Sequence, residues 1–435
     1  MNMMAKPPVV WVDEKNGLVS RDVFVSEDIF KLEVERIFSR VWLYLGHDSE
    51  IPSPGDFVTR SLAGAPVIVV RVPDGSVKVL LNSCQHRGSK VCRAEAGNAR
   101  SFVCPYHAWS YDQEGKLIKT PFNNLFPEGT DFSKLNLIQV PRVESYKGLI
   151  FGSWNEDVAS LDDYLGDFRW YIDIFFARTA GRMQVLGPPQ RFRVKTNWKI
   201  AAINFGTDNQ HVYSTHIGPA SLQKGPIPRP DVGKAMGEAG LISTENGHTV
   251  SFLTSGSQGP FICALPEMVE HYQKVLTPDQ LAVMSPSFLG VGTIFPNLSF
   301  LERYLIVEQP RAGTTTTLRL WQPVSAGEME IISWAFADAE APTDFKERSL
   351  SDAIRNFGLA GVFEQEDVEL WAGIVAATSN GLSRSNSFSF QTALPTLNKP
   401  ASGHLGPGLA YGPSLAETTQ FKFFQHWNQY MEGAR

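Results

Sequence analysis

Cysteine is scarce in this sequence, with four residues in 435. So few cysteines cannot form the disulfide framework of a small secreted domain, and they favour a reducing, cytoplasmic setting. No apolar run approaches the roughly 20 residues that span a bilayer, and the N-terminus lacks the basic region and apolar core of a signal peptide. A net charge of −6 without a dense Lys/Arg block argues against nucleic acid or an anionic membrane as partner.

The composition is that of a globular protein, with 43% hydrophobic and 19% charged residues, and the length allows two or three domains. Residues 26–42 predict a helix with Ser26 as its N-cap. From 51 to about 155, short β-rich runs alternate with turns, and Pro-Asp-Gly at 73–75 between two valine-rich runs predicts a hairpin. This stretch therefore predicts one small all-β unit.

The rest of the chain mixes helices and strands. A helix is expected over 160–176, and a strand running into a helix over 191–216. Residues 225–260 are rich in Gly, Pro, Ser and Thr and predict loops, after which strand-like runs resume over 290–337. Helices are expected near 342–378 and 415–433, so the larger part of the chain reads as an α+β domain.

Two mixed Cys/His pairs stand in the all-β unit, Cys84 with His86 and Cys104 with His107. Two thiolates and two imidazoles can bind zinc tetrahedrally, or a [2Fe–2S] cluster with both histidines on one iron. Zinc fingers usually pair Cys with Cys and His with His. A pair that mixes one of each is what a Rieske cluster needs, because each loop then supplies one ligand to each iron.

The residues around these pairs, "CQHRG" and "CPYHAWSYDQEGKL", resemble the Rieske domain of aromatic-ring-hydroxylating dioxygenase large subunits. The resemblance implies that Cys84 and Cys104 hold one iron, while His86 and His107 hold the other through ring nitrogens.

Other positions in and near these loops refine the resemblance. Respiratory Rieske proteins carry a disulfide between cysteines at positions that are Ser89 and Tyr106 here, so the oxygenase-type, lower-potential branch is implied. Ala108 stands where the family usually has Gly. Cys92 and Cys263 belong to no motif and are expected to be buried, unreactive thiols.

A second constellation lies in "NFGTDNQHVYSTH", which contains Asp208, His211 and His216. The spacing of five between the histidines is not that of a zinc protease. It needs a helix end or a π-like bulge to bring both imidazoles to one point. Two histidines and one carboxylate form the facial triad that holds non-haem Fe(II). Downstream of a Rieske motif in one chain, that reading is preferred over two unrelated histidines.

The carboxylate must come from elsewhere in the sequence. "GLAGVFEQEDVELWAG" offers Glu364, Glu366, Asp367 and Glu369, and spacing alone does not choose among them. In naphthalene and biphenyl dioxygenase large subunits, a similar F-E-x-D-D run ends in the ligating Asp. That resemblance points to Asp367, with Glu366 as the alternative.

The resemblance also implies roles for two residues before the histidines. Asp208 matches the Asp that joins a cluster histidine of one subunit to an iron histidine of the next, here His107 of a neighbouring chain to His211. The alternative for Asp208 is a helix N-cap or a surface acid. Asn204 matches an Asn near the iron, whereas Ile203 departs from the family's frequent Glu.

An apolar substrate pocket is implied beside the iron. Phe205, Phe357 and Phe363 match pocket-lining positions, and Leu289 stands where relatives often carry His. Residues 225–260 are the expected lid or entrance. No Arg or Lys stands in a matched pocket position, which favours a neutral aromatic hydrocarbon over an aromatic carboxylate.

The resemblance covers nearly the whole chain and implies an α+β fold. An all-β Rieske domain (40–157) is inserted in a helix-grip catalytic domain of antiparallel sheet plus helices, which comprises an N-terminal helical part (1–39) and residues 158–435. The implied function is that of a terminal oxygenase which cis-dihydroxylates a mono- or polycyclic aromatic hydrocarbon with O₂. Electrons would come from NAD(P)H through a reductase, usually with a ferredoxin, to the [2Fe–2S] cluster and then to Fe(II). A small beta subunit in an α3β3 hexamer, or an α3 trimer, is the expected assembly.

Several alternatives remain open at this stage. A dioxygenase of an aromatic carboxylate, of the phthalate type, shares the metals, as does a Rieske monooxygenase or demethylase. A plain electron-transfer Rieske protein would need only the first 160 residues. A zinc-dependent hydrolase would be colourless, without the cluster's absorption.

Overall fold

A computed structural model describes residues 10–216, 218, 240–254, 265–305 and 313–433. The chain divides into two compact units. The smaller comprises Ile37–Tyr164, and the larger comprises Met1–Arg36 together with Leu165–Arg435. The smaller unit is thus inserted into the sequence of the larger one. At the two crossing points of the chain lie a π-helical turn, η2 (Val34–Phe38), and α2 (Leu161–Leu165).

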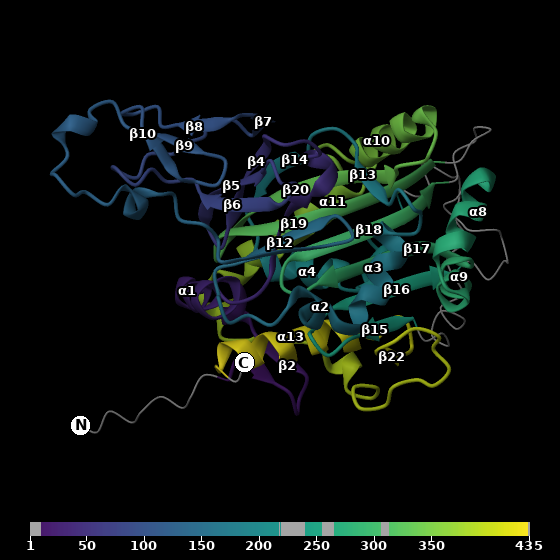
Figure 1. Cartoon of the computed structure of the whole chain (residues 1–435). Coiled ribbons are helices and arrows are strands. Elements are labelled where there is room, and N and C mark those ends of the chain that lie inside the picture. Colours follow the sequence, from purple (N-terminus) through teal and green to yellow (C-terminus); the bar gives the residue numbers. More distant parts are fainter. Residues whose placement is uncertain (1–9, 217, 219–239, 255–264, 306–312, 434–435) are drawn as a thin grey trace, which may run out of the picture. The chain divides into compact units, whose positions relative to one another are not determined.

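The smaller unit contains three antiparallel sheets, with strand orders β6–β5–β4–β7, β10–β9–β8 and β11–β12–β3 (Figure 1). Its strands are β3 (Leu43–His47), β4 (Asp56–Leu62), β5 (Ala65–Arg71), β6 (Val77–Leu81), β7 (Ala96–Asn98), β8 (Ser101–Val103), β9 (Ser110–Asp112), β10 (Leu117–Lys119), β11 (Arg142–Tyr146) and β12 (Leu149–Ser153). Its 3₁₀ turns are η3 (Asp48–Glu50), η4 (Asn123–Leu125) and η5 (Phe132–Leu135).

The hairpin expected at 73–75 joins β5 to β6. Gly75 has a φ of 87°, a conformation that side chains disfavour. The Asp74 carboxylate accepts a hydrogen bond of 2.8 Å from the Ser76 N–H and so closes the turn. Turn chemistry and two valine-rich runs thus predicted this hairpin correctly.

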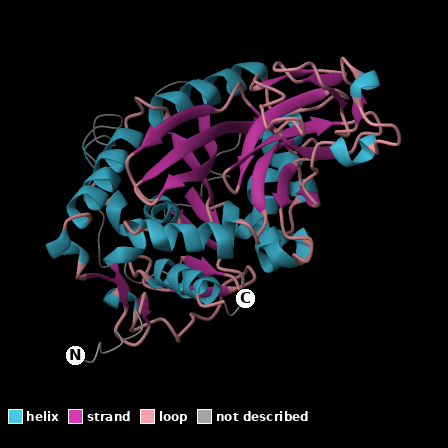
Figure 2. Ribbon diagram, turned by 90° about the vertical axis from the view of Figure 1, so that its left-hand side faces the viewer, coloured by secondary structure: helices cyan, strands magenta, loops and turns pink. Residues whose placement is uncertain are grey.

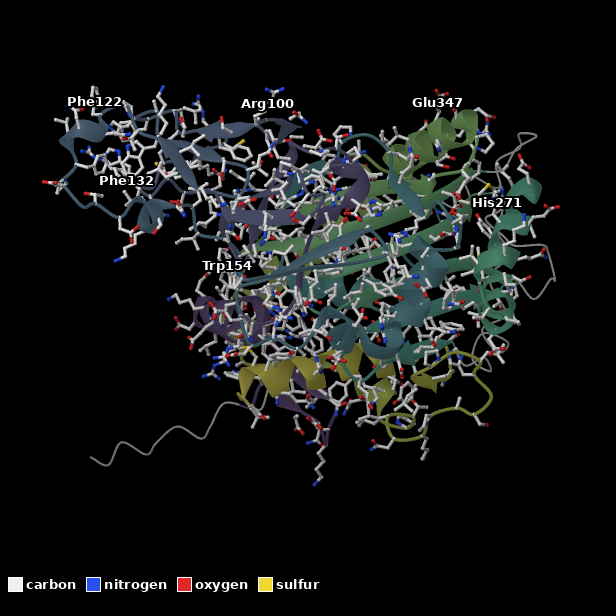
Figure 3. All side chains as sticks on the ribbon, in the orientation of Figure 1. Arg100, Phe122, Phe132, Trp154, His271 and Glu347 are labelled. Carbon is white, nitrogen blue, oxygen red and sulfur yellow. The ribbon has the colours of Figure 1, made fainter. Side chains whose placement is uncertain are left out.

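The segment between β10 and β11 carries little regular structure. Phe126 and Phe132 pack edge to face, with 5.0 Å between ring centroids, and hold part of it together. Phe122 is instead 65% exposed and lies at the surface (Figure 3).

The larger unit is built on an antiparallel sheet with the strand order β13–β20–β19–β18–β17–β16–β15–β22, and β14 also pairs with β20. A small sheet has the order β1–β2–β21. The strands are β1 (Val12–Asp13), β2 (Leu18–Ser20), β13 (Met183–Val185), β14 (Gln190–Val194), β15 (Leu241–Ser243), β16 (Thr249–Thr254), β17 (Ser287–Ile294), β18 (Leu298–Leu305), β19 (Gly313–Ser325), β20 (Glu328–Asp338), β21 (Ser387–Ser389) and β22 (Leu409–Tyr411).

The larger unit also contains helices, which are cyan in Figure 2. They are η1 (Arg21–Phe24), α1 (Glu27–Glu33), η6 (Gly166–Phe168), α3 (Arg169–Phe176), α4 (Trp198–Phe205), α5 (Asn209–Val212), α8 (Pro266–Val275), α9 (Pro278–Met284), α10 (Thr343–Phe357), α11 (Glu364–Thr378), α12 (Gly381–Arg384), η7 (Gln391–Ala393) and α13 (Thr418–Met431). No helix in the described part of the chain is long and apolar enough to cross a membrane.

Two expectations from the sequence need correction. The helix predicted over 26–42 is capped by Ser26 as expected, but it is α-helical only to Glu33 and continues as the π-helical turn to Phe38. The loops predicted over 225–260 include two strands, β15 and β16, which belong to the large sheet. Residues 219–239 and 255–264, on which the expected lid also falls, lie outside the described residues.

Candidate functional site

Two loops of the smaller unit present the mixed Cys/His pairs. In the first, the Gly88 N–H donates to the Cys84 carbonyl at 2.8 Å, and in the second the Ala108 N–H donates to the Cys104 carbonyl at 2.9 Å. The two loops therefore close with the same five-residue turn. Gly88 and Ala108 occupy the same place in it, and both have positive φ, 73° and 57°.

These loops bring the four predicted cluster residues together. The thiols of Cys84 and Cys104 are buried and form no disulfide. The rings of His86 and His107 lie 4.5 Å apart, and Trp109 stacks on His86 at 4.9 Å. The Nδ1 atom of His86 is buried and has no hydrogen-bond partner in the described part of the chain, which leaves it available to a metal.

The arrangement fits a two-iron cluster better than a zinc ion. Around a tetrahedral zinc all four ligand atoms would lie within about 4 Å of one another, since metal–ligand distances are about 2.0–2.3 Å. In the described residues, no three of Cys84, His86, Cys104 and His107 place ligand atoms within 4.8 Å of one another. In a two-iron cluster each iron takes two of the four ligand atoms, so the four atoms need not all lie close together.

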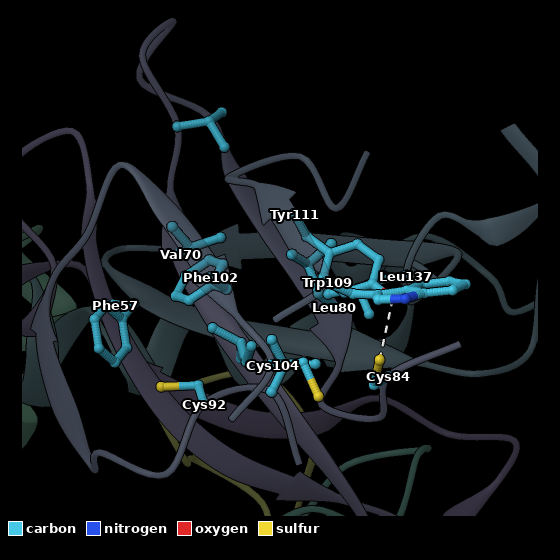
Figure 4. Packing of buried hydrophobic residues seen from close by; sticks show 13 residues of the cluster. Phe57, Val70, Leu80, Cys84, Cys92, Phe102, Cys104, Trp109, Tyr111 and Leu137 are labelled. Carbon is cyan, nitrogen blue, oxygen red and sulfur yellow. Dashed lines mark hydrogen bonds between the residues drawn. The ribbon is translucent and has the colours of Figure 1, made fainter. Parts of the chain in front are cut away.

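Tyr111 is a member of this site that sequence reasoning missed. Its hydroxyl lies 3.3 Å from the Cys84 sulfur (Figure 4). It also accepts a hydrogen bond of 3.2 Å from the Gln85 N–H. Burial raises the pKa of Tyr111 above its usual range, so the hydroxyl remains a donor. Cys92 is buried as expected and lies apart from the other two thiols in Figure 4, while Cys263 is outside the described residues.

The second constellation is set up by the link between α4 and α5 of the larger unit. Asp208 caps α5, because its carboxylate accepts hydrogen bonds from the Gln210 and His211 N–H groups at 3.1 and 3.3 Å. The helix ends at Val212, so the chain has left the helical path before it reaches His216. A helix end, rather than a π-bulge, therefore accommodates the spacing of five.

His211, His216 and Asp367 converge, with one ligand atom of each within 4.8 Å of the others. The Asp367 Oδ1 atom lies 3.8 Å from the Nε2 of His211 and 3.3 Å from the Nε2 of His216. Asp367 lies in the first turn of α11, where the helix dipole favours acidic side chains. Two imidazoles and one carboxylate on one side of an ion leave further coordination positions open.

The donor set fits an iron ion. Among the described residues the Asp367 Oδ1 atom is buried and accepts no hydrogen bond, although an unpaired buried carboxylate oxygen is unfavourable. A cation between the three residues would satisfy it. Burial lowers the pKa of His211, but the hydrogen bond to Asp208 and the charges of Asp367 and Asp208 outweigh this and raise it. The acidic surroundings thus favour a cation at this point.

Glu366, the alternative carboxylate, faces the opposite nitrogen of His216. Its Oε2 atom lies 3.1 Å from the His216 Nδ1. A carboxylate at this position orients the imidazole and makes the other ring nitrogen a better ligand. The sequence identified Asp367 and Glu366 as candidate ligands but did not show which acid faces which nitrogen of His216. The Asp208 backbone carbonyl plays the corresponding part for the Nδ1 of His211, at 2.5 Å.

The four predicted pocket residues are all buried. Phe363 lies edge-on to His216, with 5.2 Å between ring centroids, and Phe357 stacks on Phe363 at 5.8 Å. The Arg319 guanidinium carbon lies 5.0 Å from the centroid of the Phe205 ring and 4.8 Å from that of the Phe357 ring. Leu289 lies in β17 of the large sheet, opposite Arg303 of β18. Phe357 and Phe363 thus form an apolar pair that reaches His216, and the Arg319 guanidinium lies between this pair and Phe205.

Known proteins match both units. Residues 41–138 match the Rieske [2Fe-2S] domain family, and residues 161–433 match the ring hydroxylating alpha subunit (catalytic domain) family. The chain belongs to the ring-hydroxylating dioxygenase alpha-subunit family. It is an oxidoreductase of that family, with a Rieske [2Fe–2S] domain and a mononuclear-iron catalytic domain. The predicted α+β fold class and cofactors are therefore confirmed.

Individual family members align over almost their full length. The benzene 1,2-dioxygenase alpha subunit of Pseudomonas putida is 33% identical, over 96% of this chain and 92% of that protein. The alpha subunit of an N,N-dimethyl phenylurea N-demethylase from Sphingobium is 32% identical, over 94% and 91%. The crystal structure of a Rhodococcus naphthalene 1,2-dioxygenase bound to indole has a TM-score of 0.88 and 36% identity, over 95% and 94% of the two chains.

Proposed function

We propose that this alpha subunit is a terminal oxygenase that adds both atoms of O₂ to one double bond of a mono- or polycyclic aromatic hydrocarbon framework. The ring, O₂, two electrons and two protons yield a cis-dihydrodiol. The observation that carries the proposal is the convergence of His211, His216 and Asp367 in a chain that also contains a Rieske domain. The similarity to benzene and naphthalene dioxygenases supports an aromatic substrate.

The metal ligands follow from the same residues. We assign Cys84 and Cys104 to one iron of the cluster and His86 and His107 to the other. His211, His216 and Asp367 are assigned to Fe(II), and the contacts described above support this set. When bound, the Fe(II) supplies the open positions at which O₂ can be activated. We also propose that residues 40–157 form the Rieske domain and that residues 1–39 and 158–435 form the catalytic domain.

The remaining residues bind the substrate, exclude water and carry electrons. Phe205, Leu289, Phe357 and Phe363 are assigned to the substrate pocket, because buried aromatic and aliphatic side chains hold a ring and keep water from the metal. Asp208 is assigned to the electron path from the partner subunit's His107 to His211. Its hydrogen bonds to α5 orient it beside His211 and support that role. Asn204, one turn before Asp208, is assigned to the surroundings of the iron.

The oligomeric assembly, the electron partners and the cellular location are further parts of the proposal. We propose an α3β3 hexamer, or an α3 trimer, that receives electrons from NAD(P)H through a reductase with or without a ferredoxin. The small number of cysteines supports a cytoplasmic location.

A second candidate function is monooxygenation or N-demethylation by the same metals. The 32% identity to the phenylurea N-demethylase alpha subunit supports it as the alternative. Dihydroxylation is preferred because the buried phenylalanines beside His216 suit a flat ring.

Reconstitution with electron partners and a panel of aromatic compounds tests the proposal. Benzene, naphthalene, biphenyl and an N,N-dimethyl phenylurea are supplied with NADH and O₂, and the products are identified by mass spectrometry. We expect dihydrodiols from at least one ring compound. Exclusive formation of demethylated or monohydroxylated products would favour the alternative, and a His211→Ala variant serves as the inactive control.

A further inference from the structure

An arginine lies next to the aromatic group of the iron site. Arg303 belongs to β18, and its guanidinium carbon lies 4.2 Å from the centroid of the Phe363 ring. The Phe363 ring in turn lies 5.2 Å from His216. Arg303 is therefore one aromatic ring away from a proposed iron ligand. Its position was not among those matched to the family's pocket, so the sequence gave no sign of it.

Arg303 differs from two buried arginines of the larger unit in having no acidic partner among the described residues. Arg178 is paired with Glu302 and Asp338, and Arg319 with Glu364. Arg303 is partly buried, yet it makes no hydrogen bond or ion pair with the described residues. Burial alone lowers its pKa to about 10, so it is charged at neutral pH. A partly buried charge without an acidic partner is unfavourable, and such groups are often found at ligand-binding sites.

Two hydroxyl groups lie on the same face of the sheet as Arg303. Thr315 of β19 is directly opposite Arg303, and Thr317 is opposite Leu301, so the three polar side chains are neighbours across the two strands. The hydroxyls of Thr315 and Thr317 are buried and have no hydrogen-bond partner among the described residues. By contrast, Thr316, on the other face, has its hydroxyl 3.3 Å from the Glu302 carboxylate.

We propose that Arg303, Thr315 and Thr317 bind a carboxylate carried by the aromatic substrate, with the ring of that substrate held near Phe363. A guanidinium offers only donors and a hydroxyl can donate, whereas a carboxylate only accepts, so the two sets are complementary. The inference rests on the proposed function. It adds that a ring bearing a carboxylate is preferred to the bare hydrocarbon. The carboxylate is a binding group and is unchanged in the reaction.

Three matched ligands test this preference on the intact, metal-loaded protein. 2-Naphthoate carries the charge, 2-naphthamide has nearly the same shape without it, and naphthalene is the bare ring. Dissociation constants are measured by calorimetry, and KM and kcat by turnover with electron partners. We expect the wild-type protein to bind 2-naphthoate about 10- to 100-fold more tightly than the amide, as is typical of hydrogen bonds to a charged group.

Variants of the protein then test which residues cause the preference for the carboxylate. Arg303→Met should weaken 2-naphthoate binding about 10- to 100-fold, and it should weaken naphthalene binding by a clearly smaller factor. Thr315→Val should weaken 2-naphthoate binding less, and Arg303→Lys should retain part of the preference. Arg193→Met, which changes an exposed arginine of β14, is the matched control and should have no effect. Iron content and the cluster's absorption are recorded for each variant.

Two results would overturn the inference. One is equal affinity of the wild-type protein for 2-naphthoate and 2-naphthamide, which requires no variant to fold. The other is an Arg303→Met protein, with iron intact, that loses affinity equally for all three ligands, because Arg303 would then be a packing residue. A retained carboxylate preference without any hydroxylated product would contradict the proposed function while supporting the binding site.

Discussion

At the scale of single residues, His216 shows how the iron site is held in shape. Its Nε2 atom faces Asp367 at 3.3 Å and its Nδ1 atom faces Glu366 at 3.1 Å. Two adjacent acids of α11 therefore act on opposite edges of one ring. One completes the proposed ligand set, and the other fixes the ring's orientation.

Removing the orienting acid should weaken iron binding without destroying the site. For Glu366→Ala we expect an iron affinity about 10- to 100-fold lower, as is typical when an outer hydrogen-bond partner of a ligand is lost. Iron retention is measured against a competing chelator. Glu369→Ala, on the exposed side of the same helix, is the control. Equal iron affinity in the two variants would show that Glu366 does not support His216.

Ala108 marks a strained position in the second cluster loop. Its φ of 57° matches the 73° of Gly88 in the first loop, but only Gly88 lacks a Cβ. A left-handed residue with a Cβ costs about 1–2 kcal/mol, part of which glycine loses again through its greater freedom in the unfolded chain. Ala108→Gly should therefore stabilise the protein by about 0.5–1 kcal/mol.

Denaturant unfolding followed through the cluster's visible absorption measures this change. Ala96→Gly, in strand β7 of the same unit, is the matched control and should destabilise by about 0.5–1 kcal/mol. If both substitutions destabilise the protein, the loop backbone at 108 is not strained.

At the scale of elements, Glu33 joins three helices of the larger unit. It accepts a hydrogen bond from the Trp198 indole of α4 at 2.9 Å and from the Trp427 indole of α13 at 2.8 Å. It is also paired with Lys199 at 2.6 Å, and both charged side chains are fully buried. The pKa of Lys199 is lowered by burial despite this partner. The end of α1 is thus fixed against α4, the helix that leads to the iron site.

Neutralising Glu33 should be strongly destabilising. Glu33→Gln leaves the Lys199 charge buried without a counter-charge, and breaking a buried pair in this way typically costs about 3–5 kcal/mol. Asp28→Asn, in an exposed pair with Lys31 on the same helix, should change stability by less than about 1 kcal/mol. Thermal unfolding of the two variants makes the comparison. A loss at Glu33 no larger than that at Asp28 would contradict the anchoring role.

Local sequence predicted the elements whose signals are local. The β5–β6 hairpin, the Ser26 cap and the paired Cys/His loops follow from turn chemistry, capping and ligand spacing. The strands β15 and β16 were missed because their Gly- and Thr-containing surroundings read as loops, whereas pairing with β17 and β22 forms them.

Contacts between distant segments could not be read in the same way. Sequence spacing did not distinguish Asp367 from Glu366, because the two residues are adjacent in α11. In the structure they face different nitrogens of His216, Asp367 the Nε2 and Glu366 the Nδ1. Arg303 became visible only when β18, β19 and the start of α11 were brought together. Its strand pattern gave no reason to separate it from a solvent-facing arginine.

At the scale of the whole molecule, the proposed electron path runs from the cluster of one subunit to the iron site of the next. Asp208→Asn should retain both metal centres, because the residue is not a proposed ligand. It should slow substrate-dependent reoxidation of the reduced cluster by O₂ about 10- to 100-fold. Stopped-flow absorption follows the cluster in a single turnover. Asp279→Asn, an exposed change in α9, is the control, and normal reoxidation in Asp208→Asn would remove Asp208 from the electron path.

Labelled oxygen gives the most direct test of the central claim that this protein is a ring-dihydroxylating oxygenase. The reconstituted protein is supplied with NADH, an accepted aromatic substrate and ¹⁸O₂, and the product is analysed by mass spectrometry. We predict a dihydrodiol in which both hydroxyl oxygens carry the label, and no product from Asp367→Ala. A product with a single labelled oxygen, or with oxygen from water, would contradict the account.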